Sequence, residues 1–405
     1  MIFDIENSEI RKYMAEGEFG IERESLRVNA DGTLAQSPHP FGKHKNIDRD
    51  FCENQIELIG DVFDTPAKLN AQLLELQEIV NTELRKRNEL LWPFSNPPRI
   101  SGEEEIPVAE YHGSLKSKSV YRQYLAQKYG KKKMLFSGIH LNFSFPERLL
   151  RILFEQRGGD SFKDFRNDVY LRLAGRLTEY AWLVVFLTAA SPVADKTIGT
   201  GSNIYSSVRC SEIGYWNYFT PILDYTSLDK YIGSIERYIE DGNLRSVSEL
   251  YYPVRLKPRG ENSLESLAEK GINHLELRVI DVNPLSPTGI FTDDIRFIHL
   301  LLIYLASLPD SEFDESLQLK AIRDIKSAAL YGNTEMKQRA EKELEKINSF
   351  MIEYYPEFSD VMEYQQKKLT FGRSYAEMIS GQYSGDYMKK GLELAEKYQR
   401  RDCNV

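Results

Sequence analysis

The sequence predicts an α/β or α+β protein in which strands with polar inward-facing side chains are wrapped by helices. Apolar stretches with the alternation of strands recur at 19–28, 134–145, 249–258 and 272–284. Helical periodicity fills much of the remaining chain, and we find no internal repeat and no low-complexity tract in the sequence. No linker is distinct enough to divide the chain into independent domains.

Composition and charge narrow the class of protein. Hydrophobic residues make up 41% and charged residues 28% of the 405 residues, which is enough for a packed core and argues against disorder. The net charge of −9 argues against a dedicated nucleic-acid binder and against an anionic membrane surface as partner. The most apolar stretches, 181–190 and 297–306, are about half as long as a membrane span and predict buried helices.

Cysteine usage and the N-terminal sequence predict a cytoplasmic protein. Cys52, Cys210 and Cys403 lie far apart without CxxC spacing, so neither a zinc site nor a disulfide framework is expected. The first residues, MIFDIENSEIRKYM, lack the basic and apolar segments of a signal peptide.

Helices are expected at four places. The clearest follows Thr65, a good N-cap, has Pro66 in its first turn, and ends before the proline-rich stretch WPFSNPP. Further helical stretches are 119–129, about 159–190, and most of the chain beyond Thr292.

One long loop, 195–215, is rich in glycine and serine. Loops of this length inside compact domains are usually functional. Its TIGTGS stretch has the glycine content of a phosphate-binding loop but lacks the Lys-Ser/Thr ending of a P-loop, so a P-loop is not predicted.

Two carboxylates stand on one side of the first predicted strand. Glu22 and Glu24 point the same way because side chains alternate along a strand. Like charges at this separation repel, and each resists burial unless a cation or a proton neutralises it. The pattern predicts a positively charged partner in front of them.

Other strand-like stretches also place polar side chains among apolar neighbours: Asp50, Glu53 and Glu57; His140 and Asn142; Glu276 and Arg278. Each group has an ordinary structural explanation when it is considered alone. Glu276 and Arg278 could be a surface ion pair, His140 a core histidine with its hydrogen bonds made, and Asp50 a helix cap. If the strands are neighbours, however, their polar faces converge on a concave acidic site. Carboxylates with one imidazole and no thiolate suit Mg²⁺ or Mn²⁺, and with an arginine nearby they are typical of phosphoryl transfer. The residues alone therefore predict a metal-dependent site that uses ATP.

The chain resembles the bacterial glutamate–cysteine ligases, and most closely the ligase half of the bifunctional enzymes that make glutathione. Eight stretches match motifs of that family in the same order: FGIERESLRVNADGTLA, DFCENQIELI, WPFSNPP, SGIHLNFSF, SPVA, SSVRCSEIGY, LYYPVR and LELRVIDVNPLSP. The resemblance implies one catalytic domain over residues 1–405, with a motif-bearing core at about 19–290 and a helical C-terminal part at about 291–405.

The resemblance also implies a fold and a reaction. The fold would be α+β, with a glutamine-synthetase-like antiparallel catalytic sheet wrapped by helices. ATP would phosphorylate the γ-carboxylate of L-glutamate, and the amine of L-cysteine would attack that acyl phosphate. The products would be γ-glutamylcysteine, ADP and phosphate, in the first step of glutathione biosynthesis. Only small-molecule partners are implied, and the oligomeric state stays open. Without a second ATP-binding module, we expect that the chain does not complete glutathione synthesis alone.

Site residues follow from the resemblance motif by motif. Six match the family's ligands for two or three Mg²⁺ ions, with Mn²⁺ as an alternative: Glu22, Glu24, Asp50, Glu57, His140 and Glu276. Arg278 matches a catalytic arginine near the transferring phosphate of ATP, and Arg209 matches one that binds an amino-acid substrate. A bidentate guanidinium suits both roles. The other predicted substrate-binding residues are Asn142, Tyr121, Tyr215 and Tyr251.

Three alternatives remain open. A related ligase would join glutamate to a different amine, because acceptor choice depends on the shape of the pocket. A guanidino kinase of related architecture would lack the ligase motifs, and a non-catalytic binding protein would have lost acidic ligands that are all present here. Cys52 and Cys210 depart from the family's motifs, and Cys52 is expected either to be a packing substitution or to alter the pocket.

Overall fold

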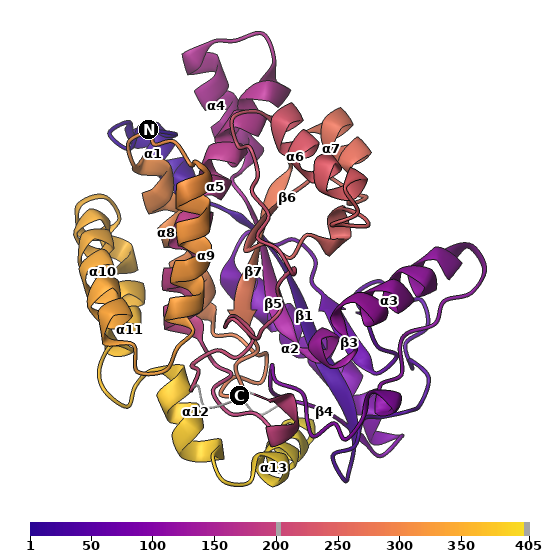
Figure 1. Ribbon diagram of the computed structural model, residues 1–405. Helices are drawn as coiled ribbons and strands as arrows, with labels where there is room; N and C mark the ends of the chain where they lie inside the picture. The colour runs from indigo at the N-terminus through magenta and orange to yellow at the C-terminus, as the bar shows by residue number, and fades with distance from the viewer. Residues whose placement is uncertain (200–203, 401–405) are drawn as a thin grey trace.

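The computed structural model of the chain describes residues 1–199 and 204–400. In these residues a seven-stranded antiparallel sheet runs through the middle of the molecule in the order β2-β3-β1-β5-β7-β6, with β4 paired to β1 (Figure 1). The strands are β1 (Glu18–Asn29), β2 (Ile47–Arg49), β3 (Gln55–Ile59), β4 (Glu89–Leu91), β5 (Gly138–Ser144), β6 (Val254–Lys257) and β7 (His274–Asp281).

Helices surround this sheet. They are α1 (Ser8–Met14), α2 (Pro66–Arg85), α3 (Lys116–Tyr129), α4 (Glu147–Arg157), α5 (Phe162–Thr188), α6 (Leu228–Glu240), α7 (Leu264–Lys270), α8 (Thr292–Ser307), α9 (Glu315–Ala328), α10 (Thr334–Tyr354), α11 (Ser359–Lys367), α12 (Tyr375–Tyr383) and α13 (Tyr387–Gln399). The predicted α+β fold, with an antiparallel sheet wrapped by helices and a helical C-terminal part, is confirmed.

The two faces of the sheet differ in character because side chains alternate along each strand. Odd-numbered residues of β1 and β5, such as Phe19, Ile21 and Leu141, belong to the main apolar core together with residues of α2, α5 and α8. The even-numbered residues therefore point to the opposite face. This second face is the one on which the predicted acidic side chains lie.

Helix α2 forms as the sequence predicts. The Thr65 hydroxyl accepts the Lys68 amide at 3.4 Å and Pro66 is the first helical residue. The apolar stripe of the helix is buried: Leu69, Leu73, Leu76, Val80 and Leu84.

The other predicted elements are present with changed bounds. The strand expected at 249–258 is shortened to β6, and the one expected at 134–145 begins at Gly138, after a turn of 3₁₀ helix. The apolar stretch at 181–190 lies in α5 as far as Thr188, and the stretch at 297–306 lies wholly in α8, both as buried helix. Within the described residues, no helix combines the length and apolarity needed to cross a bilayer.

The C-terminal helices are fastened to the rest of the molecule by buried contacts. Lys368, which follows α11, forms an ion pair with Asp294 of α8, and both side chains are buried. Tyr387 of α13 donates to the backbone oxygen of Asn96 at 2.7 Å. Gly391, also in α13, packs so closely on Trp92 that a Cβ there would lie 2.3 Å from the indole ring.

The glycine-rich stretch TIGTGS extends into residues 200–203, and Cys403 lies in 401–405; both segments are outside the described residues. Cys52 and Cys210 are free, buried thiols.

Candidate active site

One cavity of about 190 Å³ opens on the polar face of the sheet, and its walls contain most of the predicted site residues. All six candidate metal ligands line it, together with Arg278, Tyr121, Tyr215 and Tyr251. The strand register explains the convergence. Glu24 of β1 lies opposite Glu57 of β3, and Glu22 lies opposite His140 of β5.

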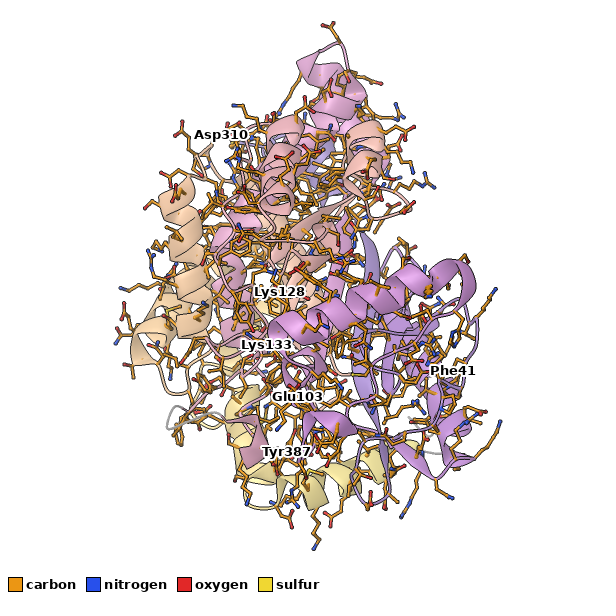
Figure 2. All side chains as sticks on the ribbon, turned by 45° about the vertical axis from the view of Figure 1, so that its right-hand side comes forward. Phe41, Glu103, Lys128, Lys133, Asp310 and Tyr387 are labelled. Carbon is orange, nitrogen blue, oxygen red and sulfur yellow. The ribbon has the colours of Figure 1, made fainter. Side chains whose placement is uncertain are left out.

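Helix α3 closes the cavity from the side opposite the sheet. Figure 2 shows this helix lying across the front of the molecule, with Lys128 near its inner end. Lys128 Nζ lies 2.6 Å from the buried carboxylate of Glu249, which also accepts the Tyr129 hydroxyl at 2.8 Å. These bonds fix the helix, and with it Tyr121 and Arg122, against the cavity.

Glu22, His140 and Glu276 form the tightest group of candidate ligands. Their ligand atoms all lie within 4.8 Å of one another, and His140 Nδ1 is 3.2 Å from Glu22 Oε2. Burial and the charge of Arg278 lower the pKa of His140 to about 4, so its imidazole is neutral at neutral pH. Burial raises the pKa of Glu22, but the bond to His140 and nearby positive charge leave it below its ordinary value. A carboxylate and a neutral imidazole are both competent metal ligands.

The part of the cavity near β3 is acidic. Burial and the charge of Asp50 raise the pKa of Glu24 to about 7, although Glu24 accepts the Gly138 amide at 2.8 Å. Burial and the charges of Asp50, Glu22 and Glu24 raise the pKa of Glu57 well above its usual range. Crowded carboxylates of this kind ionise together only when a cation is placed among them. The oxygen-rich donor set fits a hard divalent cation such as Mg²⁺.

The part of the cavity near β6 is basic. Glu276 is 1% exposed, and its oxygens lie 2.9 Å from Arg278, 3.2 Å from Lys257 and 3.8 Å from Arg255. Burial raises the pKa of Glu276, but these three cations hold it well below its ordinary value. Arg255 and Lys257 are site residues that the sequence reasoning missed. The available signal was their alternation in LYYPVRLKP, which places both on one face of β6.

A β-bulge helps to place Arg278. Between β5 and β7 the register moves from Leu141 opposite Leu277 to Ile139 opposite Ile280, which leaves one extra residue in β7. Bulges bend a strand and redirect its side chains, and they are frequent beside active sites. The Arg278 guanidinium thereby reaches both Glu276 and His140 Nδ1, which is 3.3 Å away.

Arg209 lies in an adjoining compartment. A small cavity of about 30 Å³ is lined by Arg209 and shares Tyr215, Tyr251 and Arg278 with the main one. The guanidinium occupies the space in front of Gly138, where a Cβ would lie 2.2 Å from Arg209 Cζ.

Three other residues that the sequence analysis named do not line the main cavity: Asn142, Glu53 and Cys52. Asn142 does not line the main cavity, but its Nδ2 is 3.4 Å from Glu22 Oε1. Glu53 is outside the cavity, where it pairs with Arg49. Cys52 is fully buried among apolar side chains and does not line the cavity, which agrees with a packing substitution.

Comparison with known proteins places these features in a family. The family model of glutamate-cysteine ligase matches residues 2–245 and 236–327. Similar proteins include the glutathione biosynthesis bifunctional protein GshAB of Listeria innocua, 38% identical over 97% of this chain and 56% of the relative. The GshAB protein of Clostridium perfringens is 36% identical over 82% of this chain and 45% of the relative. The chain thus spans about half the length of these curated relatives.

Solved structures share the fold of this chain. A bifunctional glutathione synthetase from Pasteurella multocida superposes with a TM-score of 0.87 at 29% identity, covering 98% of this chain and 54% of the other. The glutamate–cysteine ligase of Francisella tularensis shares the fold, with a TM-score of 0.84 at 24% identity over 95% of this chain and 88% of the other. The match of the family model over most of the chain shows that this protein belongs to the glutamate–cysteine ligase family.

Proposed function

We propose that this chain catalyses the ATP-dependent ligation of the γ-carboxylate of L-glutamate to the amine of L-cysteine. The products are γ-glutamylcysteine, ADP and phosphate, and the reaction is the first step of glutathione biosynthesis. One observation carries the proposal: in a chain of this family, a single cavity joins a group of candidate metal ligands to four basic side chains, Arg122, Arg255, Lys257 and Arg278. A carboxylate is a poor electrophile, and its phosphorylation supplies the leaving group that the amine displaces.

Six residues would hold two or three Mg²⁺ ions, or Mn²⁺ in their place: Glu22, Glu24, Asp50, Glu57, His140 and Glu276. The raised pKa values of Glu24 and Glu57 and the neutral imidazole of His140 support this assignment. Bound there, such ions would supply positive charge that offsets the negative charge of a phosphate group.

The basic residues would interact with three anionic groups: a phosphoryl group, the Glu276 carboxylate and a substrate carboxylate. Arg278 is held by Glu276 and His140 in the cavity wall, where its fork can bind the transferring phosphoryl group of ATP as its charge develops. Arg255 and Lys257 keep Glu276 ionised. Arg209 faces the adjoining compartment, and we assign it to a carboxylate of L-glutamate, the amino-acid substrate that is phosphorylated first.

The aromatic residues enclose the reacting groups. Tyr215 and Tyr251 lie between the two compartments with ring centroids 4.2 Å apart, and Tyr121 projects from α3. We assign these three tyrosines to the acceptor side, with Asn142 as a further substrate contact near Glu22. Enclosure by aromatic rings keeps water from an acyl phosphate. We place the reaction in the cytoplasm, where thiols stay reduced, and expect neither nucleic acid nor a membrane as partner.

One assay tests the proposal. ADP release is measured with ATP, Mg²⁺ and L-glutamate, with and without a panel of amines, and the product is identified by mass spectrometry. Strong stimulation by L-cysteine, with γ-glutamylcysteine as product, is the expected result. Stimulation only by another amine would identify a ligase of different acceptor specificity. Phosphorylation of a guanidino compound would identify a kinase, and no release under any condition would indicate a binding protein.

A further inference from the structure

A buried carboxylate at the end of β7 has no role in the chemistry described above. Asp281 is 2% exposed, and no ion pair within 4.0 Å holds it among the described residues. Three uncharged donors satisfy it instead: the Ala190 amide at 2.9 Å, the Ser191 hydroxyl at 2.8 Å and the Ser207 hydroxyl at 3.0 Å. Burying a carboxylate is unfavourable unless its hydrogen bonds are made, so an anion at this position calls for an explanation.

Both serine hydroxyls also accept hydrogen bonds from backbone amides next to Arg209. The Ser191 hydroxyl, which donates to Asp281, accepts the Val208 amide at 3.0 Å. The Ser207 hydroxyl, which also donates to Asp281, accepts the Cys210 amide at 3.1 Å. The two amides that flank Arg209 are therefore tied to one carboxylate through two hydroxyl groups.

Neighbouring residues of β7 hold the same segment. Cys210 Sγ donates to the Val279 carbonyl at 3.3 Å, and the Arg209 guanidinium donates to the Ile280 carbonyl at 3.4 Å. The strand that carries Arg278 thus also fixes Arg209 through its next three residues. The charge of Arg209 also acts on Asp281 itself, where it partly opposes the rise in the carboxyl pKa that burial causes.

We propose that Asp281 is a positioning residue that orients Arg209 through Ser191 and Ser207, and thereby sets the affinity for the amino-acid substrate without touching it. The inference rests on the proposed function for the identity of that substrate. The hydrogen-bond polarity explains why an acid is needed. An ionised carboxylate only accepts, so both hydroxyl protons turn toward Asp281 and leave their lone pairs for the amides of Val208 and Cys210.

An amide at this position would break one of the two connections. In Asp281→Asn the amide oxygen keeps the place of Oδ2, which accepts from both Ala190 and Ser191. The NH₂ group then faces the Ser207 hydroxyl, which must accept from it. The serine proton loses its acceptor, and the bond to the Cys210 amide is disturbed. Ser207→Ala removes the same connection with a smaller change of the core.

The kinetic test separates positioning from simple stabilisation. We expect Asp281→Asn and Ser207→Ala to raise KM for L-glutamate about tenfold, with KM for ATP within about twofold of wild type. Asp294→Asn is the matched control, because Asp294 is also buried and also accepts from several donors, including Tyr375 at 2.8 Å. This control should lower the thermal unfolding temperature and leave KM for L-glutamate unchanged. An unchanged KM for L-glutamate in both test variants, or an equal rise for every substrate, would overturn the proposal.

A double-mutant cycle tests the route through Arg209. In an Arg209→Lys background, Ser207→Ala should add little to KM for L-glutamate, because the group that it positions is already gone. Full additivity of the two changes would show that Ser207 acts by another path and would overturn the proposal.

Hydrogen exchange gives a readout that does not depend on turnover. The Cys210 amide should exchange faster in Asp281→Asn and Ser207→Ala than in wild type, because both variants disturb its bond to the Ser207 hydroxyl. The Val208 amide, whose bond to Ser191 both variants keep, should exchange at the wild-type rate, and Asp294→Asn should leave both amides unchanged. If Asp281→Asn does not fold, Ser207→Ala carries this measurement and the kinetics. Exchange of the Cys210 amide that stays at the wild-type rate refutes the positioning role even in an active enzyme. Failure of the wild-type chain to form γ-glutamylcysteine instead refutes the proposed function.

Discussion

Glu24 and Glu57 are direct partners in the register between β1 and β3, and both carboxyl groups line the cavity on the polar face of the sheet. Directly opposed like charges destabilise a pair of strands. Burial and neighbouring carboxylates raise the pKa of both groups, in spite of the charges of Arg209 and Arg278 near Glu24. A sheet assembled in this way is suited to binding a cation at this face.

Replacing Glu22 by glutamine should abolish turnover and leave the fold intact. The change removes a charged ligand candidate from the group with His140 and Glu276, and we expect kcat to fall about 100-fold or more. The stabilisation of the protein by Mg²⁺ in thermal unfolding should decrease as well. Glu18→Gln is the control, because Glu18 is on the same strand but its carboxylate accepts the Ser144 hydroxyl at 2.9 Å, outside the cavity. Normal activity of Glu22→Gln would remove Glu22 from the set of metal ligands.

Arg278→Lys should lower kcat by roughly 10²–10³-fold. Lysine keeps the charge but loses the planar fork that contacts Glu276 and His140 and can bind a phosphoryl group. Single-turnover measurement of ADP formation checks the chemical step. Arg296→Lys, in an ion pair with Asp360 outside the cavity, should retain wild-type rates. Equal rates for both variants would exclude a role for the Arg278 fork in the transition state.

Gly138→Ala should weaken binding of L-glutamate with little loss of stability. The added Cβ would lie 2.2 Å from Arg209 Cζ, so the guanidinium, as the mobile end of its side chain, must move. We expect KM for L-glutamate to rise roughly tenfold, which corresponds to about 1.4 kcal/mol. Gly233→Ala in α6 is the control, because nothing lies within 4 Å of its added Cβ and alanine favours a helix. Unchanged kinetics in Gly138→Ala would mean that Arg209 has another position in solution.

His299 should make the free energy of unfolding depend on pH. The ring is buried against Phe19 and Phe143 and its Nε2 lies 3.2 Å from the Met14 carbonyl, and burial lowers the pKa of His299 to about 4. Because the folded pKa lies below the value of 6.5 for a free histidine, the unfolded chain binds the proton more readily between these values. The contribution of His299 to the free energy of unfolding is therefore fully present above pH 6.5. As the pH falls toward 4, the free energy of unfolding decreases by up to about 3 kcal/mol.

Denaturant unfolding over this pH range checks the His299 prediction. In His299→Gln, which keeps a donor for the Met14 carbonyl but does not titrate, the fall in the free energy of unfolding should be smaller than in wild type. The same pH dependence in both proteins would assign the effect to other groups.

Local sequence patterns predicted much of this fold and of its site. The cap at Thr65 and the stripe of α2 are local features, and alternation alone placed Glu22 and Glu24 on one face. Two of the short strands, β2 and β4, have three residues each, which is too few for any periodicity to be seen.

The remaining features depend on contacts between distant segments. Arg255 and Lys257 have the appearance of ordinary surface charges until β6 is paired with β7, which sets Arg255 opposite Glu276. The bulge beside Arg278 is a property of the pairing between β5 and β7 and has no signature in either strand alone. The role of Asp281 likewise becomes visible only when residues 191 and 207 are brought beside the end of β7.

The close packing of α13 on Trp92 and the burial of Lys368 against Asp294 set a lower limit on the length of a usable fragment. The family model matches only as far as residue 327. Ending the chain there would expose the indole of Trp92 and leave the buried carboxylate of Asp294 without the positive charge of Lys368. Recombinant versions that end where the match to the family model ends should therefore be insoluble, and residues 328–400 should be kept in any shortened version of the chain.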